Sequence, residues 1–188
     1  MSSSKSIRWY CYLGLAFLCI GQILLAQGMD FLAGQQPIDF AHWALLLAAV
    51  FLLGFNFAFS KTLLHTIASA MLIIGAVAHI GMSAIDFILW SFGDNFESRD
   101  MVVGQILNTP SIQFPFLIVG PAFLYTGLSL HGWRFIKTSA IPAVMTILGS
   151  AMIGGGQFIL MDRMIVVTGT LLMSVGLVWL LHKYQIQD

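Results

Sequence analysis

Three polar residues share one helical face inside an apolar stretch of the chain. His79, Ser83 and Asp86 are spaced i, i+4 and i+7, and residues at this spacing lie on the same side of an α-helix. A carboxylate near an imidazole orients the ring for proton transfer or for metal binding. We therefore predict that His79 carries a proton or binds a ligand, with Asp86 as its partner.

The other histidines raise a second chemistry, the ligation of haem or of a metal ion. His65 and His79 are fourteen residues apart on one face, a separation that resembles the two-haem helix of the cytochrome b family. Imidazole is a common axial ligand of haem iron. The histidines at other span ends would supply the second ligands: His42 on one side of the membrane, and His131 or His182 on the other. Our leading interpretation assigns no cofactor, and the alternative is that the protein binds haem b or a divalent metal.

Amide side chains stand at two further positions inside apolar stretches, Asn56 and Gln157. Amides and ionisable groups within membrane spans are costly and tend to be functional. Hydrocarbon offers no hydrogen-bond partners, so polar faces should turn toward the protein interior. Polar residues form such stripes along four segments: His65, Ser69, Ala76, His79, Ser83 and Asp86; His42, Ala49, Asn56 and Ser60; Ser139, Thr146, Ser150 and Gln157; Arg163, Thr170 and Ser174. We predict that the stripes converge on a polar crevice lined by Asn56, His79, Ser83, Asp86 and Gln157.

Composition decides the class of protein that must position these residues. The 188 residues are 59% hydrophobic and only 9% charged, with a mean hydropathy of +0.90. Because an ordinary soluble domain is about one-quarter charged, this chain is predicted to be an integral membrane protein. The net charge is zero and no run of like charges occurs, which argues against a nucleic-acid partner.

Six segments have the length and apolar character of a membrane-spanning helix, which takes about 20 residues. They are 9–32, 41–59, 63–90, 111–131, 138–160 and 164–182. Strict alternation of apolar and polar residues, the mark of a membrane β-barrel, is missing from runs such as 43–55. The sequence predicts a single all-α transmembrane domain over 1–188, a polytopic bundle of six helices. The segments 33–40 and 93–110 are expected to be connections.

The basic residues indicate the orientation of the bundle. Six of the eight fall on one side, namely Lys5, Arg8, Lys61, Arg134, Lys137 and Lys183, whereas Arg99 and Arg163 fall on the other. By the positive-inside rule, both termini are expected in the cytoplasm and the protein in the cell (inner) membrane. A cleavable signal peptide ending near Ala26-Gln27-Gly28 is an alternative reading that would leave five spans.

Two very short connections, 60–61 and 162–163, each join helices that must be antiparallel neighbours. The order of long helix, long loop, helix, tight turn and helix therefore occurs twice. Since each unit has three spans, the order fits a 3+3 inverted repeat, an arrangement that places transporter substrates between the two halves.

The leading functional hypothesis is the binding or translocation of a small solute or ion through this crevice. The first alternative is a haem- or metal-dependent membrane redox enzyme that uses the histidines. The second is an accessory subunit of a larger membrane complex, in which the polar stripes only join helices. Partners besides the lipid bilayer would be the solute, a second copy of the chain or that complex. We lean against an enzyme, because no GxSxG, HExxH or phosphate-loop motif occurs and no catalytic residue can be assigned.

Overall fold

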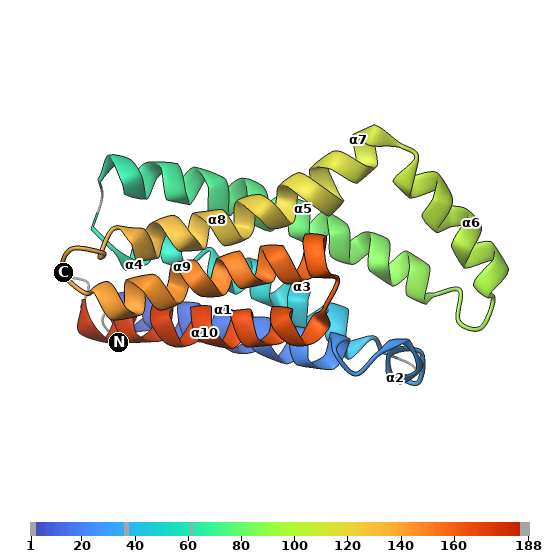
Figure 1. The fold of residues 1–188 in the computed structure, drawn as a ribbon, viewed down its shortest axis with the longest axis horizontal. Coiled ribbons are helices and arrows are strands. Elements are labelled where there is room, and N and C mark those ends of the chain that lie inside the picture. The colour runs from blue at the N-terminus through green and yellow to red at the C-terminus, as the bar shows by residue number, and fades with distance from the viewer. Residues whose placement is uncertain (1–2, 36–37, 61, 185–188) are drawn as a thin grey trace.

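The computed structural model describes residues 3–35, 38–60 and 62–184, and within these ranges the chain forms helices and no strand (Figure 1). The long helices are α1 (Ser3–Leu25), α3 (Phe40–Leu52), α5 (Leu63–Trp90), α8 (Gly120–Trp133), α9 (Ala140–Gly155) and α10 (Arg163–Lys183). The short helices are α2 (Met29–Ala33), α4 (Phe55–Ala58), α6 (Phe96–Leu107) and α7 (Pro110–Ile112). Two π-helical segments, η1 (Gln113–Val119) and η2 (Gly156–Leu160), precede α8 and follow α9.

Six stretches of helix are long and apolar enough to cross a bilayer. They are Lys5–Leu25, Phe40–Ala58, Leu63–Trp90, Pro110–Trp133, Ala140–Leu160 and Arg163–Lys183. The predicted all-α six-helix bundle is confirmed, and the chain is a multi-pass membrane protein.

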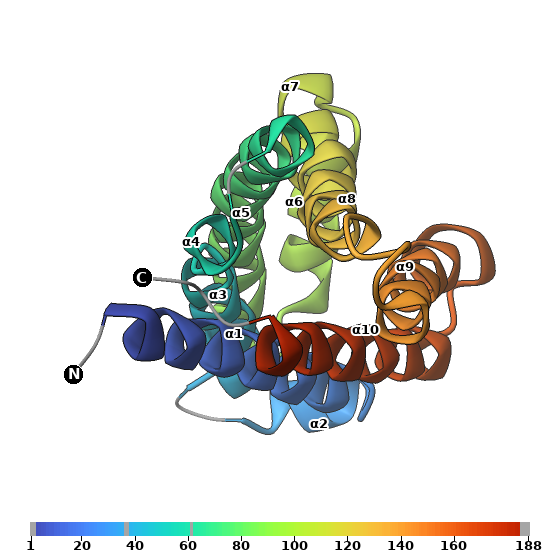
Figure 2. The ribbon, with the colours of Figure 1, turned by 90° about the vertical axis from the view of Figure 1, so that its left-hand side faces the viewer.

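The spanning helices form a ring in chain order. Each of α1, α3, α5, α8, α9 and α10 contacts the next one, and α10 closes the ring against α1 (Figure 2). The first three helices and the last three therefore each form an arc. These arcs meet where α5 packs on α8 and where α10 packs on α1.

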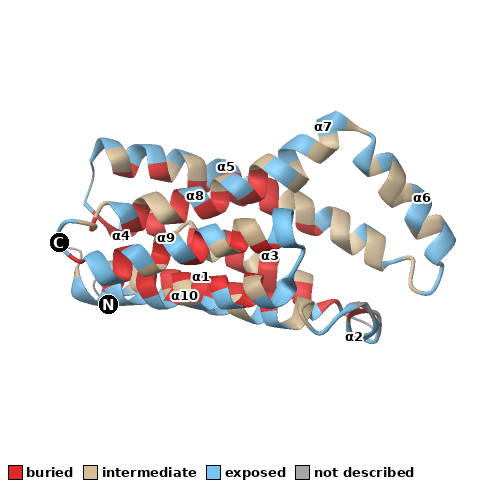
Figure 3. Ribbon diagram, in the orientation of Figure 1, coloured by how far each residue is buried: buried red, intermediate tan, exposed pale blue. Residues whose placement is uncertain are grey.

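Glycines permit the closest of these helix contacts. A Cβ atom added to Gly75 of α5 would lie 2.2 Å from the backbone nitrogen of Leu124 in α8. One added to Gly149 of α9 would lie 2.4 Å from the backbone nitrogen of Met173 in α10. Buried side chains line the inner faces of the ring, while the outer faces are exposed (Figure 3). That exposed surface is largely apolar, as lipid contact requires.

The two ends of the bundle differ. At one end, which we call the base, α1 begins, α10 ends, and the Arg134 guanidinium donates to the backbone oxygen and Oγ of Ser60. Lys183 Nζ also donates to Ser139 Oγ at 2.6 Å at the base. The opposite end, which we call the α6 end, carries α2 and α6 (Figure 1).

Two elements at the α6 end depart from our expectations. The first span ends at Leu25 rather than at residue 32, because Gly28 adopts a φ of +93° that breaks the helix before α2. The expected connection 93–110 contains helix α6, whose start is capped by Asn95 Oδ1 accepting from the Ser98 backbone N–H at 3.2 Å.

Candidate functional site

A cavity of about 790 Å³ lies inside the ring toward the α6 end. Its volume falls within the range of known small-molecule sites, about 300 to 1,000 Å³. All six spanning segments contribute to its wall. The polar lining residues are Gln22, His42, His79, Asp86, Tyr125, Thr126, Ser129, Ser150, Gln157 and Arg163. The remaining wall is apolar, so a ligand here would meet a few polar groups on a hydrophobic surface.

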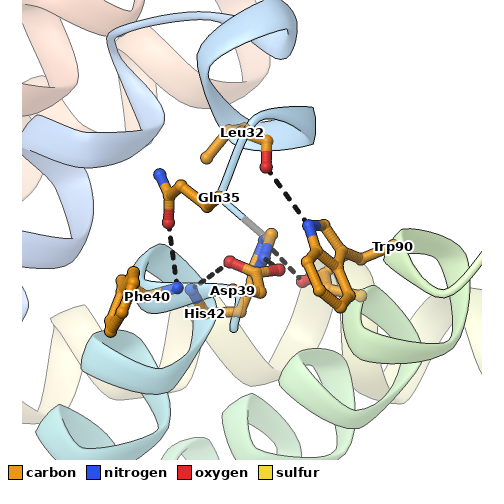
Figure 4. A network of polar contacts seen from close by, with 7 residues as sticks. Leu32, Gln35, Asp39, Phe40, His42 and Trp90 are labelled. Atoms are coloured by element: carbon orange, nitrogen blue, oxygen red, sulfur yellow. Dashed lines mark hydrogen bonds and ion pairs between the residues drawn. The ribbon is translucent and has the colours of Figure 1, made fainter. Parts of the chain in front are cut away.

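His42 lies between two carboxylates at the α6 end of this cavity (Figure 4). Its Nδ1 is 2.5 Å from Asp39 Oδ2, and its Nε2 is 3.4 Å from Asp86 Oδ2. Asp39 also caps α3, since its Oδ1 accepts from the His42 backbone N–H at 3.1 Å. These contacts connect the start of α3 to the last turns of α5 and fix the orientation of the imidazole.

The partner of Asp86 therefore differs from the one we predicted. Residues i and i+7 of a helix are about 10 Å apart along its axis, so Asp86 lies two turns beyond His79 on α5. The packing of α3 against α5 brings His42 to Asp86 instead. Trp90 adds a further contact at this end, because its Nε1 donates to the backbone oxygen of Leu32 at 3.2 Å (Figure 4).

His79 is the unusual residue of the cavity wall. Its side chain is only 2% exposed, and neither ring nitrogen has a hydrogen-bond partner among the described residues. Gln22 of α1 is 7% exposed and lines the same cavity, and its Oε1 likewise has no partner in the described part of the chain. Buried polar groups in proteins are nearly always hydrogen-bonded. These three atoms on the wall of one cavity are the groups that a ligand would satisfy.

The charged groups gather at the α6 end of the site. A second pocket of about 230 Å³ adjoins the cavity there and shares His42, Asp86 and Arg163 with it. Asp30 and Arg99 line this smaller pocket. The charged groups of the cavity thus lie at the α6 end, where the polar surface of a bilayer would lie.

Between the cavity and the base, aromatic and histidine rings fill the ring of helices. His65 and His131 are in edge-to-face contact, with ring centroids 5.1 Å apart, and both are buried. Phe55 and Phe59 pack against His131 with centroid distances of 6.3 and 6.1 Å. This layer, which we call the basal plug, closes the space below the cavity.

The predicted site residues separate into two groups. His79, Asp86 and Gln157 line the cavity, and the Gln157 Oε1 accepts from Arg163 Nη1 at 3.0 Å. Ser83 is buried on α5 but is not part of the cavity wall. Asn56 lies at the basal plug, where its backbone oxygen is 3.1 Å from His65 Nε2, because it is near the base end of the span Phe40–Ala58. Each of the four polar stripes thus contributes to the cavity wall, through Asp86, His42, Ser150 and Arg163 respectively, but Asn56 and Ser83 lie outside that wall.

The candidate haem or metal ligands are dispersed in the same way. His42 and His79 line the cavity, whereas His65 and His131 belong to the basal plug and contact each other directly. That contact leaves no room for a porphyrin between the two rings. His182 borders a separate groove between α1 and α10. Within the described ranges, no three His, Cys, Asp or Glu side chains form a group that could hold a metal ion.

Sequence reasoning missed several wall residues. Gln22 is an amide inside a predicted span, so the argument that selected Asn56 and Gln157 would have selected it also. Tyr125 stands in the middle of α8 and also lines the cavity. The Asp39 cap on α3 could have been read from the i, i+3 spacing of Asp39 and His42 at the start of a helix.

No protein family, curated protein or solved structure matches the chain.

Proposed function

We propose that this membrane protein binds a small solute in the cavity and translocates it across the bilayer. The observation that carries the proposal is the buried imidazole of His79, which has no hydrogen-bond partner among the described residues and lies on the wall of a ligand-sized cavity. A buried polar group without a partner costs about 1 to 3 kcal/mol. A bound solute that hydrogen-bonds to His79 recovers part of that energy.

The two ends of the ring support a directional pathway. The cavity reaches the charged α6 end, whereas the basal plug closes the opposite side. By the positive-inside rule, the α6 end faces away from the cytoplasm, so the cavity lies on the outer side of the basal plug. For release on the other side, the rings of Phe55, Phe59 and His131 in the basal plug must separate. The hydrogen bond from Arg134 to the Ser60 backbone oxygen at the base must also break.

A paired-variant binding screen tests the proposal. Ala151 lines the cavity and is exposed, so Ala151→Phe places a ring in the cavity without displacing core residues. Leu148→Phe is the matched control, because Leu148 is an exposed residue of the same helix that is not on the cavity wall. A library of water-soluble and lipid-soluble small molecules is added to each purified protein, and thermal stability is measured.

We expect at least one compound to raise the melting temperature of the wild type and of Leu148→Phe, but not that of Ala151→Phe. Equal stabilisation of all three proteins would place binding elsewhere and refute the proposed site. The wild type is then reconstituted into vesicles, and uptake of such a compound into the vesicles is measured.

A further inference from the structure

The cavity is open to the side, at the level of the bilayer. Ala122 and Thr126 of α8, and Ala151 of α9, line the cavity and are nevertheless exposed, although each lies inside a spanning segment. All three belong to α8 and α9, so the exposed part of the wall lies along these two helices, at the level of the lipid.

The path of α8 and α9 explains this opening. Near the base the helices pack closely, with Gly132 against Thr146, and midway Ser150 Oγ donates to the backbone oxygen of Tyr125 at 3.4 Å. Beyond this point α8 continues into η1, which packs on α5 and rises away from α9 (Figure 1). Proline lacks the N–H that a regular helix needs, and Pro115 lies within the π-helical turn.

The α9 side of the opening is also unfilled. Gly154 lines the cavity, and a Cβ atom added to it would have no neighbouring heavy atom within 4 Å. Facing rows of small or apolar side chains on α8 and α9 thus border a slot, which we call the α8–α9 slot. Its surface suits a hydrocarbon chain better than a hydrated solute.

The inner part of the cavity wall has a different character, because its polar groups are uncharged. Gln22, His79, Tyr125 and Ser150 come from four different helices, and His79 lies near the middle of α5. An ionised ligand group at this depth would meet no opposite charge, and a charge near the bilayer centre is costly. A neutral head group is therefore favoured there.

The unpaired atoms specify the hydrogen bonds of that head group. Gln22 Oε1 is an acceptor that needs a donor, while a neutral His79 ring offers one donor and one acceptor. A hydroxyl group pairs with one atom of each residue, since it can donate to Gln22 Oε1 and accept from the N–H of His79. Neighbouring side chains cover these atoms in the structure, so both side chains must rotate when the head group enters.

Resting on the proposed function, we infer that the ligand is a neutral, membrane-soluble amphiphile with a hydroxyl head. The head hydrogen-bonds to Gln22 and His79, and the hydrocarbon tail leaves through the α8–α9 slot into the lipid. The ligand enters sideways from the bilayer and does not have to pass the charged groups at the α6 end.

A photolabelling experiment in phosphatidylcholine nanodiscs tests this inference. The probe is hexadecanol carrying a diazirine on its chain, and the matched probe is its methyl ether, which cannot donate a hydrogen bond. Labelled sites are mapped by peptide mass spectrometry in the wild type, His79→Leu and Gln22→Leu. His131→Leu is the control variant, because His131 is also a buried histidine whose ring nitrogens have no partner in the described chain, but it lies outside the cavity wall.

We expect the alcohol to label α8 and α9 along the slot, with excess unlabelled hexadecanol competing. Losing one neutral hydrogen bond should reduce labelling about fivefold in His79→Leu and Gln22→Leu, and for the ether. His131→Leu should label as the wild type does. Labelling spread evenly over the lipid-facing surface, or equal labelling by alcohol and ether, would overturn the inference.

The two proposals fail in different ways. If water-soluble compounds stabilise the wild type but not Ala151→Phe, while the alcohol probe does not label the slot, the amphiphile inference is wrong and the cavity remains a solute site. If no compound distinguishes Ala151→Phe from Leu148→Phe and the slot is not labelled, both proposals are wrong.

Discussion

Two glycines of α9 should respond in opposite ways to the same substitution. In Gly149→Ala the new Cβ atom would lie 2.4 Å from the Met173 backbone nitrogen and 2.5 Å from the Gly169 backbone oxygen. In Gly154→Ala the new atom would point into the open cavity, with no heavy atom within 4 Å. Comparing the two substitutions therefore distinguishes a glycine that permits close packing of α9 on α10 from a glycine that borders the cavity.

The magnitudes follow from these distances. Ordinary van der Waals contact begins at 3.4 Å, so α9 and α10 must move apart by about 1 Å to accept Gly149→Ala, because both clashing atoms belong to the backbone. Overpacking of this kind costs about 1 to 3 kcal/mol. Gly154→Ala instead restricts the unfolded chain and improves helix propensity, which stabilises by about 0.5 to 1 kcal/mol.

Equilibrium unfolding in mixed micelles, followed by circular dichroism, measures both variants against the wild type. We expect Gly149→Ala to unfold at a lower denaturant fraction and Gly154→Ala at the same or a higher one. If the two substitutions destabilise equally, α9 is packed along its whole length and the cavity does not exist in the folded protein.

Three further outcomes are expected. His42→Leu removes the ring that pairs with the buried Asp39 and should lower the unfolding free energy by about 1.5 to 3 kcal/mol. Asp86→Asn should lower it by less, because the Asp86–His42 contact is longer than the Asp39–His42 contact, 3.4 Å against 2.5 Å. Equal losses in the micelle titration would show that the two contacts stabilise the protein equally. Trp90→Phe removes the indole donor to Leu32 and should speed proteolysis near α2 without changing global stability, and an unchanged cleavage rate would show that this bond does not hold α2. In a cysteine-free background, Asp94→Cys should react with a membrane-impermeant maleimide on intact cells and Lys137→Cys should not, while the reverse pattern would invert our orientation.

Much of the fold was readable from the sequence because each element carries a local signal. The uniform apolar character of six segments predicts the spanning helices. On α5 the spacing of His65, His79, Ser83 and Asp86 gave the buried face, since helical periodicity fixes which side chains share a side. The break after Leu25 was missed because it depends on the positive φ of Gly28, a conformation that no apolar pattern reveals.

The candidate site was only partly predictable, because it depends on contacts between helices. His79 and Asp86 were identified individually, but the pairing of Asp86 with His42 follows from the packing of α3 on α5. That same packing leaves His79 without a partner among the described residues. The absence of a partner depends on every neighbouring side chain, so it can be read only from the structure. Asn56 was misplaced because it lies near the base end of its span, beside the basal plug, whereas the cavity lies toward the α6 end.

The most direct test of the central claim is an experimental structure of the protein in a lipid nanodisc, at a resolution that resolves side chains. We expect α8 and α9 to diverge toward the α6 end, with non-protein density in the cavity within hydrogen-bonding distance of His79. Helices that remain in contact along their whole length, with His79 hydrogen-bonded to another side chain of the protein, would contradict it.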